Sequence, residues 1–170
     1  LFRSNLLKKI QHRGQESYGF CYLRSKADNQ NTIITEKFQG KINNTEVTDF
    51  YSKMIIGHCR YSTSGKSKLI NTNDESKLIL KETQPISGKN ILGEFKLIHN
   101  GNIPNIEADD SISDSHTLVK YIENYKIDID INDINNSKTK RELWLKILKN
   151  LLLEFKKAYC LIIMTIDELY

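Results

Sequence analysis

The chain has 170 residues, enough for one domain with a sizeable core. Its composition, with 39% hydrophobic and 27% charged residues, is typical of a globular protein and argues against wholesale disorder. The net charge of +4 comes from lysines scattered among acidic residues, which argues against a nucleic-acid groove, and no apolar run approaches the roughly 18 residues of a membrane span. Residues 1–10 do not resemble a signal peptide, so we expect a cytoplasmic protein that binds neither nucleic acid nor membrane.

The first half of the chain reads mainly as strands. Ser4 can cap a short helix that ends at Gly14, and strands are predicted over residues 18–23, 32–38 and 54–61 because β-branched and aromatic residues gather there. Residues 45–52 read as a short helix. The polar, aperiodic stretch at residues 65–81 is predicted to be a long surface loop.

The second half mixes strands and helices. A short strand is predicted over residues 95–98, a helix over 114–125 with Ser113 as its cap, and a strand over 158–165, whereas residues 128–137 fit either an edge strand or a linker. Thr139 and Glu142 form a capping-box pattern before a longer helix. Its predicted apolar face consists of Trp144, Ile147, Leu148, Leu151, Leu152 and Phe155. This mixture indicates a layered α+β domain.

The three cysteines, Cys21, Cys59 and Cys160, are far apart in apolar or strand-like stretches. Neither a disulfide framework nor a metal-binding spacing is indicated, so we expect buried free thiols.

Four short polar segments stand out: QHRGQES (11–17), GHCRYSTSG (57–65), HNGNIPN (99–105) and SDS (113–115). In the second segment, Arg60 ends an apolar strand, and its planar guanidinium suits a carboxylate held by two parallel hydrogen bonds. A surface ion pair is the plainer alternative. The hydroxyl-rich turn that follows, residues 61–65, can surround a small polar substrate.

Asn100 and Gly101 form the commonest two-residue hairpin signal, but Pro104 lacks the donor that a returning strand needs. The functional alternative is an oxyanion hole, made by the Asn100 amide and the Gly101 backbone N–H. Asp114 reads either as a helix-capping group or as the counter-ion of an α-ammonium group. With Arg60 at the opposite pole, this constellation predicts a glutaminase.

These segments, in this order, resemble the class II glutamine amidotransferases, and specifically the amidophosphoribosyltransferase branch. The segment Thr83, Gln84 and Pro85 is also similar to that family. Relatives that make glucosamine phosphate tend to read RGYDS and RWATHG, whereas this chain reads RGQES and RYSTSG. The resemblance covers about residues 4–165, although residues 65–83 are longer, and residues 101–113 shorter, than is usual in the family.

The resemblance implies a four-layer αββα sandwich of the N-terminal nucleophile hydrolase type, with two antiparallel sheets between helical layers. It implies that Arg60, Thr63 and Asp114 bind glutamine and that Asn100 and Gly101 form the oxyanion hole. Arg13 is expected to support the catalytic end of the site. His58 and His99 are interpreted as structural.

The nucleophile that the resemblance implies is an N-terminal cysteine whose own α-amino group acts as base. The chain begins instead at Leu1, so residues 1–170 are expected to be a glutamine amidotransferase domain truncated at both ends and inactive alone. Cys59 is not expected to replace that cysteine, because neighbours on a strand point to opposite faces and Cys59 therefore cannot face the substrate with Arg60.

The function implied for the parent protein is release of ammonia from glutamine and its transfer to a downstream phosphoribosyltransferase domain. That domain would make phosphoribosylamine from phosphoribosyl pyrophosphate, the first step of purine biosynthesis, and any magnesium would belong there. No metal or cofactor is expected in this domain, and a homo-oligomer is compatible with the resemblance. The alternatives are an inactive glutamine-binding or interaction domain, a glucosamine-phosphate synthase relative, or an unrelated scaffold whose motifs are turns and caps.

Overall fold

The computed structural model describes residues 7–25, 31–42, 52–61, 72–103, 113–127, 136–156 and 159–170. These residues form two three-stranded antiparallel sheets, ordered β2-β1-β3 and β4-β5-β6, together with helices. The strands are β1 (Ser17–Ser25), β2 (Asn31–Gln39), β3 (Ile55–Arg60), β4 (Ile86–Asn90), β5 (Gly93–Gly101) and β6 (Tyr159–Thr165). The helices are α2 (Thr72–Glu82), α3 (Asp114–Asn124), α4 (Ser137–Glu154) and the 3-10 turn η1 (Gln11–Arg13), which follows helical residues 7–10.

The first sheet is built around β1, which pairs with β2 on one side and β3 on the other. Because β1 is central, both of its faces are buried, and its side chains alternate between them. Tyr18 and Phe20 point to the outer face, where both stack near Phe38. Cys21 and Leu23 point the other way. The predicted strands in this half of the chain are confirmed.

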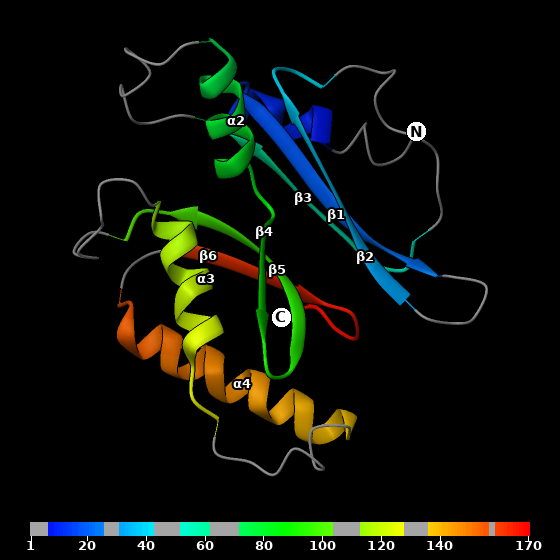
Figure 1. Cartoon of the computed structure of the whole chain (residues 1–170), viewed down its shortest axis with the longest axis vertical. Helices are drawn as coiled ribbons and strands as arrows, with labels where there is room; N and C mark the ends of the chain where they lie inside the picture. The colour runs from blue at the N-terminus through cyan, green and yellow to red at the C-terminus, as the bar shows by residue number, and fades with distance from the viewer. Residues whose placement is uncertain are drawn as a thin grey trace.

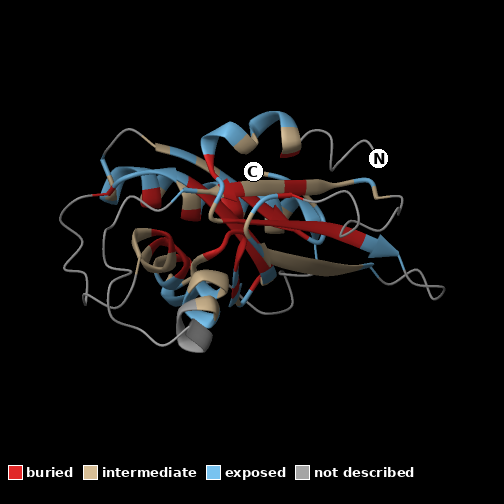
Figure 2. Cartoon of the chain, turned by 90° about the horizontal axis from the view of Figure 1, so that it is seen from above, coloured by how far each residue is buried: buried red, intermediate tan, exposed pale blue. Residues whose placement is uncertain are grey.

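The second sheet packs against α3 and α4, which lie on its side away from the first sheet (Figure 1). Phe95 and Leu97 of β5 are fully buried there, and Phe95 meets the ring of Trp144 edge-on at 5.4 Å between ring centroids. Figure 2 shows buried residues gathered in strands at the centre of the molecule, whereas β2 contains only intermediate and exposed residues. The main core therefore lies between this sheet and its helices.

The two sheets also face each other. Cys21, Leu23 and Ile56 of the first sheet pack with Ile98 and Met164 of the second. Residues two positions apart on a strand share a face. His58 and Arg60 therefore lie on the same face of β3 as Ile56, and Asn100 lies on the same face of β5 as Ile98. This shared geometry brings the polar ends of β3 and β5 together.

Two elements differ from the sequence prediction. Helix α2 occupies residues for which the sequence predicts a loop, and its apolar residues 78–80 are consecutive instead of following a helical period, which explains the error. Strand β4 is absent from the sequence prediction. Its sequence, ISGKN, is polar and contains Gly88, which lies directly against the Phe95 ring and leaves it room.

Helix α4 confirms the predicted long helix, but it starts earlier than predicted and its buried face is narrower. The cap is Asn136, whose side chain accepts a hydrogen bond from the Lys138 N–H at 2.9 Å, so the helix begins before the predicted capping box. Leu152 is 56% exposed and does not belong to the buried face. Cys160 is likewise exposed, contrary to the prediction, because it alternates outward along β6, whereas Cys21 and Cys59 are buried free thiols.

Several predictions fall outside the described residues: the Ser4 cap, the helix over residues 45–52, Thr63, and most of residues 128–137. Ser113 stands at the N-cap of α3 as predicted, but its hydroxyl contacts the His116 ring at 3.0 Å and makes no capping hydrogen bond. Within the described ranges, no helix has the length and apolarity needed to cross a membrane.

Candidate functional site

A cavity of about 480 Å³ opens where the ends of β3 and β5 meet the start of α3. Four of the five residues assigned from the sequence line it, namely Arg60, Asn100, Gly101 and Asp114. Thr63, the fifth, lies outside the described residues. Residues separated by more than fifty positions in the chain thus share one concave site, which is the usual form of a small-molecule site.

Arg60 projects from the last position of β3 and forms an ion pair with Glu16. Burial lowers the pKa of Arg60, an effect that the nearby Glu82 carboxylate opposes. Glu16 belongs to the QHRGQES segment that stands out in the sequence, although the sequence assigns its carboxylate no role. Arg60 thus lines the cavity and already binds one carboxylate of the protein, that of Glu16.

Asn100 and Gly101 are the last residues of β5, where they pair with Cys160 and Tyr159 of β6. They do not form the two-residue hairpin, in line with the argument from Pro104. Gly101 has φ of 153°, which favours glycine and leaves its backbone open to close approach. The Asn100 side chain is exposed at the cavity.

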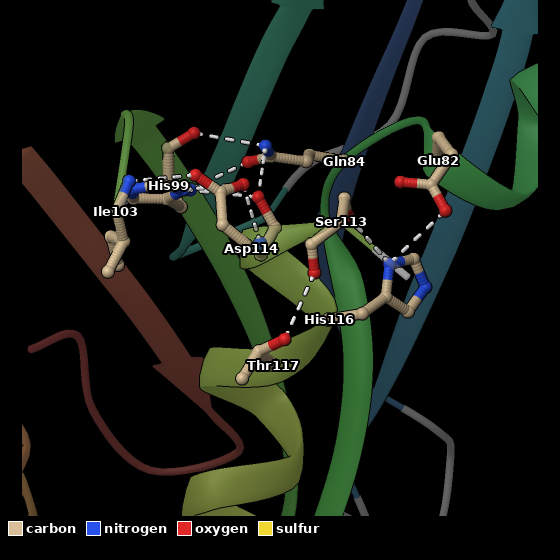
Figure 3. A network of polar contacts seen from close by, with 9 residues as sticks. Glu82, Gln84, His99, Ile103, Ser113, Asp114, His116 and Thr117 are labelled. Atoms are coloured by element: carbon tan, nitrogen blue, oxygen red, sulfur yellow. Dashed lines mark hydrogen bonds and ion pairs between the residues drawn. The ribbon is translucent and has the colours of Figure 1, made fainter. Parts of the chain in front are cut away.

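Asp114 connects the start of α3 to the chain that follows β5 (Figure 3). Its Oδ1 accepts a hydrogen bond from the Ser115 N–H at 2.8 Å, and its Oδ2 accepts one from the Ile103 N–H at 3.2 Å. The carboxylate stays partly exposed, so it still presents negative charge to the cavity. It therefore combines the helix-end role that the sequence suggested with a position suited to a cationic group.

Two histidines form the inner wall of the cavity. Burial lowers the pKa of His58 to about 4, and the neighbouring His99 acts in the same direction. Burial also lowers the pKa of His99, against the opposing charge of Asp114, whose Oδ1 is 3.7 Å from its Nδ1. Within the described part of the chain, neither His58 Nδ1 nor His99 Nε2 has a hydrogen-bond partner. Both imidazoles are therefore neutral at physiological pH.

Glu82 adds a second carboxylate to the wall, beside α3. Burial acts to raise its pKa, but hydrogen bonds from His116 and Ser113 and the charges of His116 and Arg60 outweigh this and lower the pKa. No sequence signal marks Glu82, because it ends a helix for which the sequence predicts a loop. The cavity thus contains both signs of charge, as a zwitterionic ligand requires.

Cys59 is among the residues that line the cavity, but its side chain packs in the cluster on the outer face of the first sheet. Cys59 Sγ donates to the Leu7 carbonyl at 3.7 Å, and burial raises its pKa to about 11. Cys59 and Arg60 therefore face opposite sides of β3, as predicted. Burial raises the pKa of Cys21 to about 12, and Cys160 is not among the residues of the cavity wall. In the described residues, no group of three or more His, Cys, Asp or Glu side chains is arranged to hold a metal ion.

Comparison with characterised proteins gives consistent names. The chain is 35% identical over 103 residues to the amidophosphoribosyltransferase of Archaeoglobus fulgidus, a match covering 58% of this chain and 19% of the relative. It is 28% identical to the human amidophosphoribosyltransferase over 95% of this chain and 30% of the relative, and 30% identical to the chloroplastic enzyme of Vigna aconitifolia over 60% and 19%. No protein-family model matches the chain. The chain spans between about a fifth and a third of the length of these relatives.

Proposed function

We propose that this chain is the glutamine-hydrolysing domain of an amidophosphoribosyltransferase, with an Ntn-hydrolase fold. The observation that carries the proposal is the meeting of Arg60, Asn100, Gly101 and Asp114 in the wall of one cavity. The named relatives, which extend over 58% to 95% of the chain, support the same assignment. The sandwich of two antiparallel sheets with helices is compatible with that fold type.

Glutamine binds by its two charged ends. Arg60 exchanges its Glu16 partner for the α-carboxylate of the substrate, and the carboxylate of Asp114 receives the α-ammonium group. Thr63, which lies outside the described residues, is assigned to glutamine binding by the resemblance alone. Holding both poles fixes the direction of the side chain, so that its terminal carboxamide points to Asn100 and Gly101.

Hydrolysis needs stabilisation of a negative oxygen. When a thiolate attacks the carboxamide carbon, the carbonyl oxygen becomes an oxyanion, and the Asn100 side-chain N–H and the Gly101 backbone N–H donate hydrogen bonds to it. The α-amino group of the same cysteine, protonated when the thiolate formed, returns its proton to the leaving nitrogen, so that ammonia departs and a thioester remains. Water then hydrolyses the thioester to glutamate and restores the thiol. As the resemblance implies, the proposed thiol is that of an N-terminal cysteine of the longer protein. Burial raises the pKa of both Cys21 and Cys59, which makes them poor nucleophiles.

The released ammonia serves a downstream phosphoribosyltransferase domain, where it attacks phosphoribosyl pyrophosphate and gives phosphoribosylamine for purine synthesis. Magnesium belongs with that domain. His58 and His99 have no proton-transfer role in this scheme, because the α-amino group of the nucleophilic cysteine acts as the base.

The test is glutamate release from glutamine by the full-length protein that carries this chain. Asn100→Ala should lower kcat by about 100-fold with little change in KM, since one oxyanion donor contributes about that much. Asn150→Ala, on α4 and distant from the cavity, is the control and should retain wild-type kcat. A folded wild-type protein that binds glutamine but releases no glutamate would favour the non-hydrolysing alternative, and one that does neither would refute the assignment.

A further inference from the structure

Gln84 is a buried residue that precedes β4, and its side-chain amide contacts the backbone of a single residue on β5. Its Oε1 accepts a hydrogen bond from the His99 N–H at 2.6 Å, and its Nε2 donates to the His99 carbonyl at 3.0 Å. His99 directly precedes Asn100 and Gly101. Gln84 therefore holds the strand at the point where the proposed oxyanion donors begin.

The register of the second sheet explains this contact. Strand β4 pairs with β5 as far as Ile86 opposite Leu97, so continuing the same register would place Gln84 opposite His99. Pro85 cannot donate a backbone hydrogen bond, and the ladder with β4 stops there. The side-chain amide of Gln84 supplies one donor and one acceptor in place of a paired strand residue.

The same amide also reaches α3. Nε2 of Gln84 donates its second hydrogen to Ser115 Oγ at 3.1 Å, and Ser115 Oγ lies 3.1 Å from His99 Nδ1. The Ser115 hydroxyl can accept a second hydrogen bond or donate its own hydrogen, so this contact forms with either neutral tautomer of His99. Ser115 is the neighbour of Asp114, whose Oδ1 accepts the Ser115 N–H. One side chain thus connects the oxyanion end of β5 with the ammonium end of α3.

We infer that Gln84 is a positioning residue, which fixes Asn100 and Gly101 relative to Asp114 without itself binding substrate. Both hydrogens of its Nε2 are used within the protein, and its Oε1 is engaged by the His99 N–H, so it has no donor left for glutamine although it lines the cavity. This inference rests on the proposed glutaminase function for its kinetic consequence, but the clamp itself is a property of the backbone of residues 99–101.

Gln84→Met in the full-length protein keeps the volume and removes the amide's hydrogen bonds. We expect kcat for glutamate release to fall by about 10-fold or more while KM for glutamine changes by less than about 3-fold, because small displacements of the donors affect the transition state more than the ground state. Asn90→Ala is the matched control, since Asn90 also uses its side chain to hold backbone in the β4–β5 hairpin, at Leu92, but at the far end. It should leave both constants unchanged.

Gln84→Glu provides a second variant with a pH readout. The ionised carboxylate can accept a hydrogen bond from the His99 N–H, but its other oxygen cannot donate to the His99 carbonyl. The protonated carboxyl group has one O–H, which can donate to that carbonyl. Burial raises the pKa of the introduced carboxyl group above the ordinary value for glutamate, into the range between about pH 5.5 and pH 8. The activity of the variant relative to wild type should therefore rise as the pH falls through this range. Taking the ratio at each pH removes the contributions of the other titrating groups around the clamp, which are His58 on β3, His99 on β5, Glu82 and Asp114. A ratio that does not change with pH would contradict the clamp.

Amide hydrogen exchange at His99 and Gly101 separates the inference from the proposed function. The Gln84→Met protein should exchange both amides at least about 10-fold faster than wild type, with the amides of β1 unchanged as a check on folding. Unchanged exchange, or a fall in kcat matched by an equal rise in KM, overturns the positioning role while leaving the glutaminase assignment standing. If the Gln84→Met protein exchanges faster but the wild-type protein shows no glutaminase activity, the clamp is supported and the proposed function is refuted.

Discussion

Arg60, which lines the cavity that we assign to glutamine, forms an ion pair with Glu16. The Glu16 carboxylate therefore binds the same guanidinium that is proposed to bind the α-carboxylate of glutamine. Both side chains are about three-quarters buried, so the pair is screened less than a surface pair and its exchange carries a measurable cost.

Glu16→Gln should tighten glutamine binding, because the competing charge is removed while the shape is kept. A partly exposed ion pair contributes up to ~1 kcal/mol, so we expect Kd to fall by up to about 5-fold. Calorimetric titration measures this. Glu36→Gln is the control, since Glu36 accepts a hydrogen bond from Tyr22 on the first sheet and should leave Kd unchanged. Weaker binding in Glu16→Gln would show that Glu16 orients Arg60 instead of competing for it.

Asp114→Asn tests the opposite pole. The substitution removes the negative charge but keeps an amide oxygen for one of the two backbone donors, at Ser115 or Ile103. Glutamine should bind about 10- to 100-fold more weakly, whereas glutaramate, which lacks the ammonium group, should be little affected. Equal losses for the two ligands would mean that Asp114 acts only through the helix start.

Stability should fall in acid because of His58. Its pKa is about 6.5 in the unfolded chain and about 4 in the folded protein, so the unfolded state binds more protons between these values. Stability contributed by the neutral imidazole is complete above about pH 6.5 and is lost as the pH falls to about 4, by about 3 kcal/mol. Urea unfolding at several pH values measures this. The increase in the free energy of unfolding between about pH 4 and pH 6.5 should shrink in His58→Gln. It should remain in the control His12→Gln, since His12 is exposed.

Two adjacent leucines of α4 provide a test of the core. Leu151 is fully buried among the residues that cover the second sheet, whereas Leu152 is 56% exposed. Leu151→Ala should lower the free energy of unfolding by about 2–5 kcal/mol, and Leu152→Ala by less than about 1 kcal/mol. Similar losses at the two positions would contradict the orientation of this helix.

The sequence predicts those elements whose buried residues form a clear apolar pattern along the chain. Strand β1 is a run of apolar and aromatic residues buried on both faces, and α4 carries a broad apolar face, so both are recognisable. Helix α2 and strand β4 are not, because their placement depends on contacts made elsewhere: Gly88 fits beneath Phe95, and Thr83 after α2 donates to the Ile79 carbonyl at 2.7 Å. The prediction for Leu152 is wrong because the helical period alone does not fix the width of a buried face.

The site can be predicted in part. Arg60 and Asp114 stand out because an isolated charge beside turn residues is visible in the sequence, and both line the cavity. Gln84 enters only as part of a resemblance, since nothing local indicates that its amide reaches His99. Its role depends on strand register, which a single sequence does not specify for a strand as short and polar as β4.

The most direct test of the account compares three ligands by calorimetry on the full-length protein: glutamine, glutaramate without the ammonium group, and 4-aminobutanamide without the carboxylate. Wild type should bind glutamine at least about 10-fold more tightly than either analogue, because each analogue loses one charged contact. Arg60→Ala should weaken glutamine and glutaramate but leave 4-aminobutanamide unchanged, since only the first two carry the group that Arg60 holds. An equal loss for all three ligands, or no glutamine binding by folded wild type, would contradict the proposed site.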